Sequence, residues 1–565
     1  MNASPTPIDS ASEYQRPIGM FARIAAYRPT LSVETLALLA SLFFSVFGNT
    51  VFWREVIATG DLHGATGLLS GASLFVLVTA LQTILFCLLL YRPIAKPVLM
   101  LLLLISASAI HFMSRYTIYL NEEMMRNVLH TDANESSELL TISLLYALIL
   151  YGVLPALLVW RVELKKTTWL RAIAIRLACL FAAVCVAIGS ALLSFQDLSA
   201  LMRTHHDLRH LITPGNYIVA LTQTAADSGK RMQARTPVGV DAKVAARPSG
   251  SKPRVLVLVV GETLRAQNWG LNGYARQTTP QLARIAPINF TDVTACGTST
   301  EVSLPCMFSV YGRAKYGKDR IAGSESLLHV LGHAGIRTEW RDNQSGCKGV
   351  CAGLPFVSFQ RAKGDRACLG ESCLDGVMLD DLVARITAEP GDLVIVLHQL
   401  GNHGPSYYQR HPPRLRRFTP TCDSDDLGDC SREQITNSFD NAVLYTDEFV
   451  ARAIALLSKQ SSHDAALIYL SDHGESLGEG GLYLHGMPYA IAPETQTKVP
   501  MVMWLAPGLT AARGIDSACL RAVAKRPTSH DHLFHSVLGL MQVRTAVYEP
   551  KLDLFAGCVG AGPAH

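Results

Sequence analysis

Five long apolar stretches without Asp, Glu, Lys or Arg lie within the first 200 residues of this 565-residue chain. Each is close to the about 20 residues that an α-helix needs to cross the hydrocarbon core of a bilayer. A single stretch of this kind also occurs as a buried helix of a soluble protein, but five in succession favour a membrane domain. We therefore predict five membrane-spanning helices, at residues 31–53, 66–90, 95–114, 139–160 and 175–196.

Charge in the connections between these stretches predicts their orientation. The N-terminal tail and the second and fourth connections are basic, whereas the third connection, residues 114–138, is acidic. Basic connections remain in the cytoplasm under the positive-inside rule. Five crossings then place everything after residue 196 on the opposite side of the membrane, which in a bacterium is the periplasm.

Composition changes along the chain, so its averages of 49% hydrophobic residues and a net charge of +4 describe neither part. The slight positive excess, without a long Lys/Arg run, argues against nucleic-acid binding, and we expect no nucleic-acid partner. We predict a transmembrane domain at residues 1–196, an amphipathic bridging segment and linker at 197–253, and a periplasmic catalytic domain at 254–565.

Ten of the 13 cysteines lie beyond residue 290, and eight of them form local couples. An oxidising compartment allows such couples to close as disulfides. Buried thiols or a zinc ribbon are the alternatives, but no CxxC pair occurs, which disfavours the ribbon. Cys519 and Cys558 lie outside the couples, and their separation of 39 positions gives no geometric support for pairing them, so this bridge stays open. The expected disulfides are Cys296–Cys306, Cys347–Cys351, Cys368–Cys373 and Cys422–Cys430.

From residue 254 onward, short β-branched runs alternate with helical patterns. The runs Val255–Val260, Leu393–Leu397 and Ala466–Leu470 are typical of strands buried on both faces. Helical patterns occur around Ser324–Gly332 and Asp440–Leu457. This alternation predicts an α/β domain with a mainly parallel sheet covered by helices on both faces, and with its ligand site beyond the carboxyl ends of the strands.

Each of the three predicted strands leads directly into polar residues that can bind a metal ion. Glu262 follows the first strand, His398 and the GNHGP motif follow the second, and Asp472-His473 follows the third. Carboxylate oxygen and imidazole nitrogen are suitable zinc ligands. A lone Asp-His pair is more often a structural couple, but three coincident strand ends favour a metal site.

Hydroxyl groups cluster in residues 296–306, CGTSTEVSLPC, at what the pattern indicates is the start of a helix. A helix N-terminus attracts phosphate, and a hydroxyl beside a divalent metal ion loses its proton readily and becomes a nucleophile. An ordinary helix cap explains the same residues when they are considered alone. The spacing does not identify which hydroxyl would attack.

Five long motifs make the chain resemble the bacterial phosphoethanolamine–lipid A transferases, the family that includes the mobile colistin-resistance enzymes. A lone SDHG would indicate only the wider alkaline phosphatase and sulfatase superfamily. The motifs are GETLRAQNWGLNGYARQTTPQL (261–282), CGTSTEVSLPCMFS (296–309), WRDNQSGCKGVC (340–351), HQLGNHGP (398–405) and SDHGESLGEGGLYLHGMP (471–488). The resemblance implies a five-span membrane domain joined to a periplasmic, sulfatase-like α/β domain.

The resemblance also implies roles for individual residues. Thr300 matches the nucleophile, and His403 and His485 match histidines around the phosphoryl group that sometimes hold a second zinc ion. Ser345 and Lys348 match residues near the bound phosphoethanolamine. The positions that match the catalytic zinc ligands are Glu262, Thr300, Asp472 and His473.

Three residues of the acidic third connection match positions implicated in lipid-substrate binding in the family. They are Asn127, Thr131 and Glu135. Their spacing of four also suits any exposed helix face, so this assignment has a structural alternative.

The implied activity is transfer of phosphoethanolamine from phosphatidylethanolamine to a phosphate of lipid A. It would proceed through a covalent intermediate on Thr300 and lower susceptibility to polymyxins. We expect a monomeric, multi-pass protein of the bacterial inner membrane with its catalytic domain in the periplasm. Three alternatives remain open: a transferase with another sugar or glycan acceptor, a membrane-bound metal-dependent phosphodiesterase or sulfatase, and a lipid-binding sensor without activity.

Overall fold

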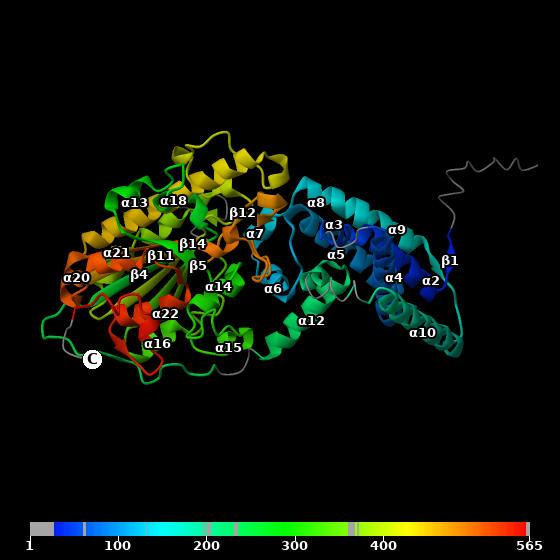
Figure 1. Cartoon of the computed structure of the whole chain (residues 1–565), viewed down its shortest axis with the longest axis horizontal. Coiled ribbons are helices and arrows are strands. Elements are labelled where there is room, and N and C mark those ends of the chain that lie inside the picture. Colours follow the sequence, from blue (N-terminus) through cyan, green and yellow to red (C-terminus); the bar gives the residue numbers. More distant parts are fainter. Residues whose placement is uncertain are drawn as a thin grey trace, which may run out of the picture. The chain divides into compact units, whose positions relative to one another are not determined.

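The computed structural model describes residues 28–59, 64–131, 133–195, 198, 201, 205–230, 235–359, 368–369 and 372–560 (Figure 1). The chain forms two compact units. The first comprises Met1–Phe47, His63–Ile105 and Ile149–Leu198, and the second comprises Gly48–Leu62, Ser106–Leu148 and Ser199–His565. This division differs from the blocks expected from composition, because parts of the apolar N-terminal third pack within the second unit. The functional boundaries at residues 196 and 253 therefore stay predictions.

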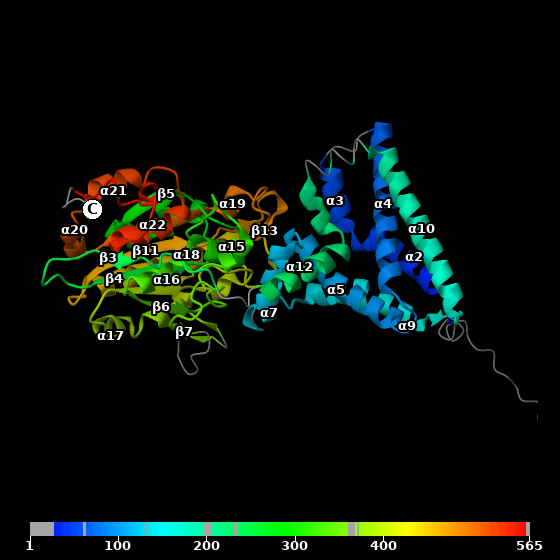
Figure 2. The ribbon, with the colours of Figure 1, turned by 90° about the horizontal axis from the view of Figure 1, so that it is seen from below.

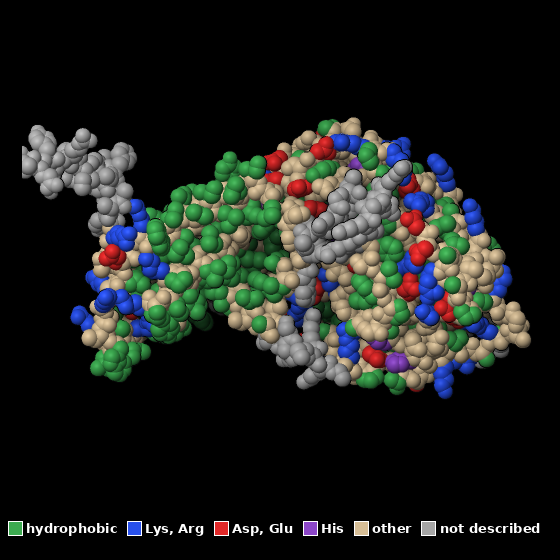
Figure 3. All heavy atoms as spheres, turned by 180° about the vertical axis from the view of Figure 1, so that it is seen from behind, with side chains coloured by type: hydrophobic (Ala, Val, Ile, Leu, Met, Phe, Trp, Pro, Cys, Tyr) green, Lys and Arg blue, Asp and Glu red, His purple; other side chains and the backbone are tan. Residues whose placement is uncertain are grey.

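The first unit is built from long helices whose outer surface is hydrophobic (Figure 3). Exposed apolar side chains such as Leu158 and Phe181, which are 67% and 73% accessible, are typical of a surface that contacts lipid. The unit contains α2 (Val33–Phe43), α4 (Gly64–Leu89), the first half of α5 (Ala95–Tyr116), α9 (Leu154–Arg161) and α10 (Trp169–Leu193).

Within the described residues, four helical segments are long and apolar enough to cross a membrane: Gly67–Leu89, Ala95–Tyr116, Ile142–Arg161 and Trp169–Leu193. They agree with the second to fifth predicted spans. The first predicted span is broken into Val33–Gly48 and Thr50–Ala58, which meet at an angle of 53°. The two pieces make a fifth span only if they are counted together.

Side-chain hydrogen bonds accompany the break at Asn49. The Asn49 side chain accepts a hydrogen bond of 2.7 Å from the Thr213 backbone N–H, and Thr213 Oγ1 donates to the Gly48 carbonyl at 2.7 Å. A side chain that bonds backbone groups in this way is a known cause of helix bending. Thr213 lies 164 positions away from Asn49, so the apolar pattern alone could not reveal this contact.

The second unit contains an eight-stranded sheet in the order β15-β5-β14-β11-β4-β10-β6-β7. The strand β14 is antiparallel to both neighbours, and the remaining pairs are parallel. The strands are β4 (Arg254–Gly261), β5 (Ile288–Thr294), β6 (Arg337–Asp342), β7 (Phe356–Ser358), β10 (Leu393–His398), β11 (Asp464–Ser471), β14 (Lys498–Leu505) and β15 (Thr528–Ser529). The three predicted strands lie within β4, β10 and β11.

Helices cover both faces of this sheet, as predicted (Figure 1). Alternate residues of β4 enter two separate cores: Leu258 faces α16 (Leu327–His333) and α22 (Asp531–Leu540), whereas Val257 faces α18 (Arg432–Ser458). Figure 2, viewed from below, shows α16 and α22 in front of the strands. Burial on both faces explains why β4 is apolar from Val255 to Val260 and does not alternate with polar residues.

The segment predicted to be a bridge and linker has regular structure. It contains a short 3₁₀ helix, His206–Leu211, and α12 (Gly215–Lys230). Further on, β3 (Lys243–Val244) pairs antiparallel with β16 (Val543–Arg544) near the end of the chain. This pairing satisfies backbone groups that have no partner nearby in the sequence.

The acidic third connection packs within the second unit as α6 (Glu122–His130) and α7 (Ala133–Glu138). Glu138 is buried and pairs with Arg410 in the loop after β10. Arg115, at the end of α5, forms an ion pair of 2.7 Å with Asp426. Glu138 of this connection therefore forms an ion pair within the second unit, in addition to contributing to the charge pattern that predicts membrane orientation.

Disulfides close several loops of the second unit. Three of the described bridges join local couples of the sequence, and the fourth joins Cys519 and Cys558, which lay outside those couples. Cys373 is disulfide-bonded, and Cys368 lies opposite it in the β8–β9 hairpin (Cys368–Leu369 and Ser372–Cys373), but the side chain of Cys368 lies outside the described part of the chain. The described bridges are Cys296–Cys306, Cys347–Cys351, Cys422–Cys430 and Cys519–Cys558.

Replacing Asp392 with alanine is expected to destabilise the second unit by about 3–5 kcal/mol. Asp392 accepts hydrogen bonds of 2.8 Å from both the backbone and the guanidinium of Arg254, whose side chain is 4% exposed. The variant leaves a buried cation without its main counter-charge. The measurement is the melting temperature of the full-length protein in detergent. The control is Asp429→Ala, because the Asp429 side chain is 65% exposed. Equal melting temperatures for the two variants would contradict the prediction.

Candidate active site

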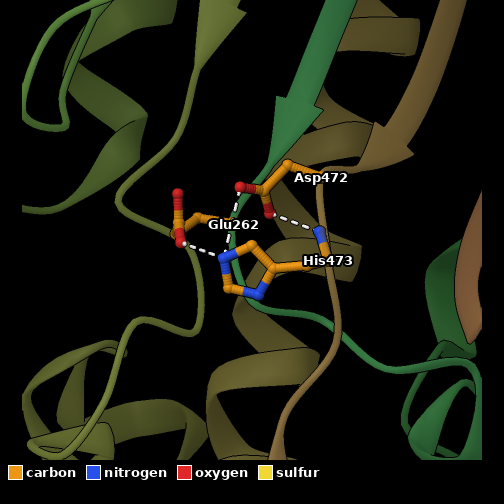
Figure 4. A group of neighbouring side chains, drawn as sticks. All are labelled: Glu262, Asp472 and His473. Carbon is orange, nitrogen blue, oxygen red and sulfur yellow. Dashed lines mark hydrogen bonds and ion pairs between the residues drawn. The ribbon is translucent and has the colours of Figure 1, made fainter. Parts of the chain in front are cut away.

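Three buried side chains that can hold a metal ion meet at the carboxyl ends of β4 and β11 (Figure 4). Glu262 follows β4, and Asp472 and His473 follow β11. The strand register aligns Ser471 with Gly261, so the next residue of each strand reaches the same edge. One ligand atom from each of the three residues lies within 4.8 Å of the other two.

Hydrogen bonds orient His473 and Asp472 toward a common point. His473 Nδ1 donates to the Gly474 carbonyl at 2.9 Å, which leaves Nε2, 3.3 Å from Glu262 Oε1 and 3.4 Å from Asp472 Oδ2, free to act as a ligand. Asp472 Oδ1 accepts from two backbone N–H groups, whereas its buried Oδ2 has no hydrogen-bond partner. A buried, unsatisfied carboxylate oxygen beside an available imidazole nitrogen fits a metal ion.

Electrostatics also favour a cation at this position. Burial and the neighbouring Glu262 carboxylate raise the pKa of Asp472 to about 6. Burial opposes a charge on His473, but the Asp472 charge and a hydrogen bond to Glu262 outweigh it and raise the His473 pKa to about 10. The two buried carboxylates therefore share one protonated imidazole as their counter-charge. A divalent ion would balance both negative charges.

Thr300 is the hydroxyl that reaches this group. It is the first residue of α14 (Thr300–Met307), and its Oγ1 donates to Glu262 at 2.9 Å and lies 3.3 Å from His473 Nε2. Two other hydroxyls of the cluster are turned to backbone carbonyls: Thr298 donates to Met487 and Ser303 donates to Asp472. The tertiary structure thereby distinguishes residues that the spacing left equivalent.

His403 and His485 lie next to this group without belonging to it. The ring of His485 is centred 4.4 Å from that of His473 and 5.7 Å from that of His403. Burial, together with the neighbouring imidazoles of His473 and His403, holds the pKa of His485 well below its usual value. Of the described residues, only Glu262, Asp472 and His473 form a group of three ligand-type side chains that could hold a metal ion. Zinc binding beside His403 and His485 therefore stays a prediction.

Ser345 and Lys348 come together in the loop after β6. Lys348 Nζ donates to Ser345 Oγ at 2.7 Å, and both residues line a cavity that also reaches Glu301. Glu301 follows Thr300 in the chain. The structure therefore brings these two predicted substrate-binding residues close to the start of α14.

The three residues predicted to bind lipid do not share one helix face. Thr131 is the C-cap of α6, with an extended backbone, and its Oγ1 donates back to the Asn127 carbonyl at 2.8 Å. The chain then begins a separate helix, α7, in which the side chain of Glu135 lies outside what the structure describes. The structural alternative, a single exposed helix face, therefore does not hold, because α6 ends between the first and third residues; lipid binding by these residues stays a prediction.

Near the site, His398 was noted in the sequence only as a polar residue at a strand end, and Asp342 received no role. His398 ends β10, and its Nδ1 lies 2.8 Å from Asp342 Oδ1, whereas its buried Nε2 has no hydrogen-bond partner and lies 3.9 Å from Glu262 Oε2. The register places His398 opposite Asp342 of β6. The position of His398 and Asp342 at strand ends could have indicated a place near the site. The sequence does not show, however, that these two distant strands pair with each other.

His530 connects the hydroxyl loop to β11. Its Nδ1 accepts from the Cys296 backbone N–H at 3.1 Å and its Nε2 donates to the Ser471 carbonyl at 3.0 Å. No motif in the sequence marks this residue, because its role is defined only by contacts with segments 234 and 59 positions away.

The fold and site together define a membrane-anchored protein with an α/β domain of the sulfatase type, and comparisons with known proteins agree. A model of the sulfatase family matches residues 254–543, and a model described as phosphoethanolamine transferase EptA/EptB matches residues 78–228.

Individual relatives resemble nearly the whole chain. Phosphoethanolamine transferase EptA of Escherichia coli K12 is 36% identical over 94% of this chain and 98% of its own length. Phosphatidylethanolamine transferase Mcr-1 of Escherichia coli is 36% identical over 85% of this chain and 90% of its own. The structure of the integral membrane protein lipooligosaccharide phosphoethanolamine transferase A of Neisseria meningitidis matches with a TM-score of 0.90 and 37% identity, covering 94% of this chain and 99% of that one. The chain belongs to the EptA family of phosphoethanolamine transferases.

Proposed function

We propose that this protein transfers phosphoethanolamine from phosphatidylethanolamine to a phosphate group of lipid A. It acts from the bacterial inner membrane with its catalytic domain in the periplasm, and the modification lowers polymyxin susceptibility because it masks negative charge on lipid A. The observation that carries the proposal is the position of Thr300 Oγ1, which is within 3.3 Å of both Glu262 and His473 at the metal-binding group.

The metal ion in this proposal is zinc. Its ligands are Glu262, Asp472, His473 and Thr300, a set of oxygen and nitrogen donors without cysteine that suits this ion. When bound, zinc supplies positive charge that lowers the pKa of a coordinated hydroxyl and stabilises negative charge on phosphoryl oxygens.

The first half of the reaction forms a covalent enzyme intermediate. Thr300 Oγ1 attacks the phosphorus atom of phosphatidylethanolamine, a new Oγ1–P bond forms, and the P–O bond to diacylglycerol breaks with its electron pair on the departing oxygen. Thr300 would lose its proton when zinc is bound, and one proton is returned to the departing oxygen, with His403 or His485 as the carrier, so that diacylglycerol is released.

The second half transfers phosphoethanolamine to the acceptor. An oxygen of a lipid A phosphate attacks the same phosphorus atom, a P–O–P link forms, and the Oγ1–P bond breaks to restore Thr300. His403 and His485, which adjoin His473, exchange protons with the attacking and departing oxygens. Ser345 and Lys348 hold the transferred phosphoethanolamine group.

The membrane helices hold both lipids near the site and so supply proximity. Asn127, Thr131 and Glu135 contact the lipid substrates in this proposal, although α6 ends between them. The enzyme acts as a monomer in this proposal.

Mass spectrometry of lipid A from cells that express the protein tests this function. We expect added phosphoethanolamine with the wild-type protein and unmodified lipid A with Thr300→Ala produced at the same level. Phosphoethanolamine found only on another sugar or glycan would overturn the acceptor assignment. Release of free phosphoethanolamine without transfer would instead indicate a phosphodiesterase.

A further inference from the structure

A buried ion pair joins the loop that carries His403 to the acidic third connection. Arg410, whose side chain is 2% exposed, forms this pair with Glu138, the last residue of α7, whose side chain is 10% exposed. The same guanidinium donates a hydrogen bond of 2.7 Å from its Nε to the His403 carbonyl. One buried arginine therefore contacts both a residue between two membrane spans and a histidine beside the metal-binding group.

The position of the His403 ring depends on its backbone more than the positions of two neighbouring histidines do. His473 Nδ1 donates to a backbone carbonyl, and His485 Nδ1 lies 3.3 Å from the Glu475 carboxylate. His403 Nδ1, by contrast, is buried and has no hydrogen-bond partner. Among the described side chains, Arg410 is the one that holds His403 by a hydrogen bond, and it does so through the backbone carbonyl.

A guanidinium suits this double contact. Its donors diverge in a fixed plane, so Nε reaches the His403 carbonyl while Nη2 donates to the Glu138 carboxylate. A buried cation that lost its carboxylate would be left without a counter-charge, which is strongly unfavourable. Glu138 therefore fixes the guanidinium of Arg410, and the guanidinium fixes the backbone of His403.

The third connection also contacts the loop of His485. Met124 of α6 packs directly on Gly486, because a Cβ atom added to that glycine would lie 2.5 Å from Met124 Cε. Gly486 follows His485 in the chain. Residues of one connection thus contact the loops of both histidines that carry protons in the proposed reaction.

We propose that Arg410 is a positioning residue for His403, and that Glu138 of the third connection holds Arg410 in place. The inference rests on the proposed transferase function and deepens it, because it states how His403 is held for proton transfer. A displacement of about 1 Å in a site can lower a rate about a hundredfold. Arg410 is not a catalytic residue, because its Nε and Nη2 donors are bonded to protein groups.

Steady-state kinetics of the full-length enzyme with phosphatidylethanolamine and lipid A test the assignment. We expect Arg410→Gln to lower kcat about thirtyfold, because His403 loses its anchor. Glu138→Gln should lower kcat about fivefold, since the amide still accepts a hydrogen bond but carries no charge. Arg410→Lys keeps the charge without the planar fork, and should lie between the wild type and Arg410→Gln. KM for either lipid should rise less than about twofold, and zinc content should stay that of the wild type.

A double-mutant cycle separates positioning from structure. Alone, His403→Ala should lower kcat about a hundredfold. Adding Arg410→Gln to that variant should lower kcat no further, because the arginine acts through the histidine that is missing.

Asp426→Asn is the matched control. It weakens the 2.7 Å ion pair between Asp426 and Arg115, near the start of the same connection, and neither of these two described residues is bonded to His403. This variant should melt at a lower temperature but keep kcat within about twofold of the wild type.

Four results would overturn the assignment. Losses that multiply in the double variant would show that Arg410 acts on the fold and not through His403. An unchanged kcat in His403→Ala would remove the role that Arg410 is proposed to support, and a loss of zinc in Arg410→Gln would place its effect on the metal-binding group. A loss of kcat in Asp426→Asn as large as that in Arg410→Gln would show a general effect of ion pairs in this connection.

The remaining outcomes are also decisive. Should Arg410→Gln not fold, the same cycle with Glu138→Gln and His403→Ala distinguishes multiplied from unchanged losses. If the wild-type enzyme transfers no phosphoethanolamine to lipid A, the proposed function itself fails. That result is distinct from an active wild type in which Arg410→Gln has no effect, which would overturn only the positioning role.

Discussion

An Asp472→Asn enzyme is expected to lose its bound zinc and about a thousandfold of its transfer activity. Asp472 Oδ2 is buried and without a hydrogen-bond partner in the protein, so the metal ion would be its main interaction. The amide has the same shape but no charge, and the loss of a metal ion removes several kcal/mol of transition-state stabilisation. Metal analysis after purification without chelator, combined with an assay of transfer to lipid A, measures both effects.

Asp429→Asn is the matched control, because it is the same substitution at a side chain that is 65% exposed. It should retain wild-type zinc content and activity. Addition of a chelator to the wild-type enzyme should reproduce the Asp472→Asn defect, and added zinc should reverse it only in the wild type. Full zinc occupancy with normal activity in Asp472→Asn would refute the proposed ligand set.

The second large effect is expected at Thr300. Thr300→Ala should form no covalent phosphoethanolamine adduct and should lose at least about ten-thousandfold of the transfer rate, since removing a nucleophile leaves only the binding and electrostatic contributions. Thr300→Ser keeps a hydroxyl at the first position of α14 and should still form the adduct, at a reduced rate. Intact-protein mass spectrometry with phosphatidylethanolamine alone detects the adduct.

Thr291→Ala controls for the loss of a threonine side chain, because Thr291 lies in β5 and is exposed to solvent. It should form the adduct at the wild-type rate. An adduct in Thr300→Ala would mean that another residue is the nucleophile. The candidates would then be the neighbouring hydroxyls, Thr298 and Ser303, which the structure shows bonded to backbone carbonyls.

Much of the fold was predictable because its signals are local. The uncharged stretches predicted α4, α5 and α10 closely, since the length of an apolar run is itself the requirement for crossing a membrane. The β-branched run in β4 predicted a doubly buried strand, and the structure has all eight of its residues buried. In both cases a property of a short segment decides the outcome, whatever lies elsewhere in the chain.

Features that depend on a distant partner were not predictable in this way. Asn49, at the bend of the first apolar segment, is hydrogen-bonded to Thr213, and β3 pairs with β16. The acidic connection was interpreted as a topological signal, but Glu138 is also half of a buried ion pair with Arg410, 272 residues away. A single sequence contains no periodicity that records such contacts.

The same distinction applies to the site. By itself, the sequence determined which chemical groups were available: a carboxylate after β4, an Asp-His pair after β11 and a cluster of hydroxyls at the start of a helix. Only the tertiary structure decided that Thr300 is the hydroxyl that meets Glu262, and that Arg410 joins the loop of His403 to the third connection. The physical reason is that residue type and local periodicity are written along the chain, whereas distances between side chains arise only when the sheet aligns its strand ends and the helices pack around them.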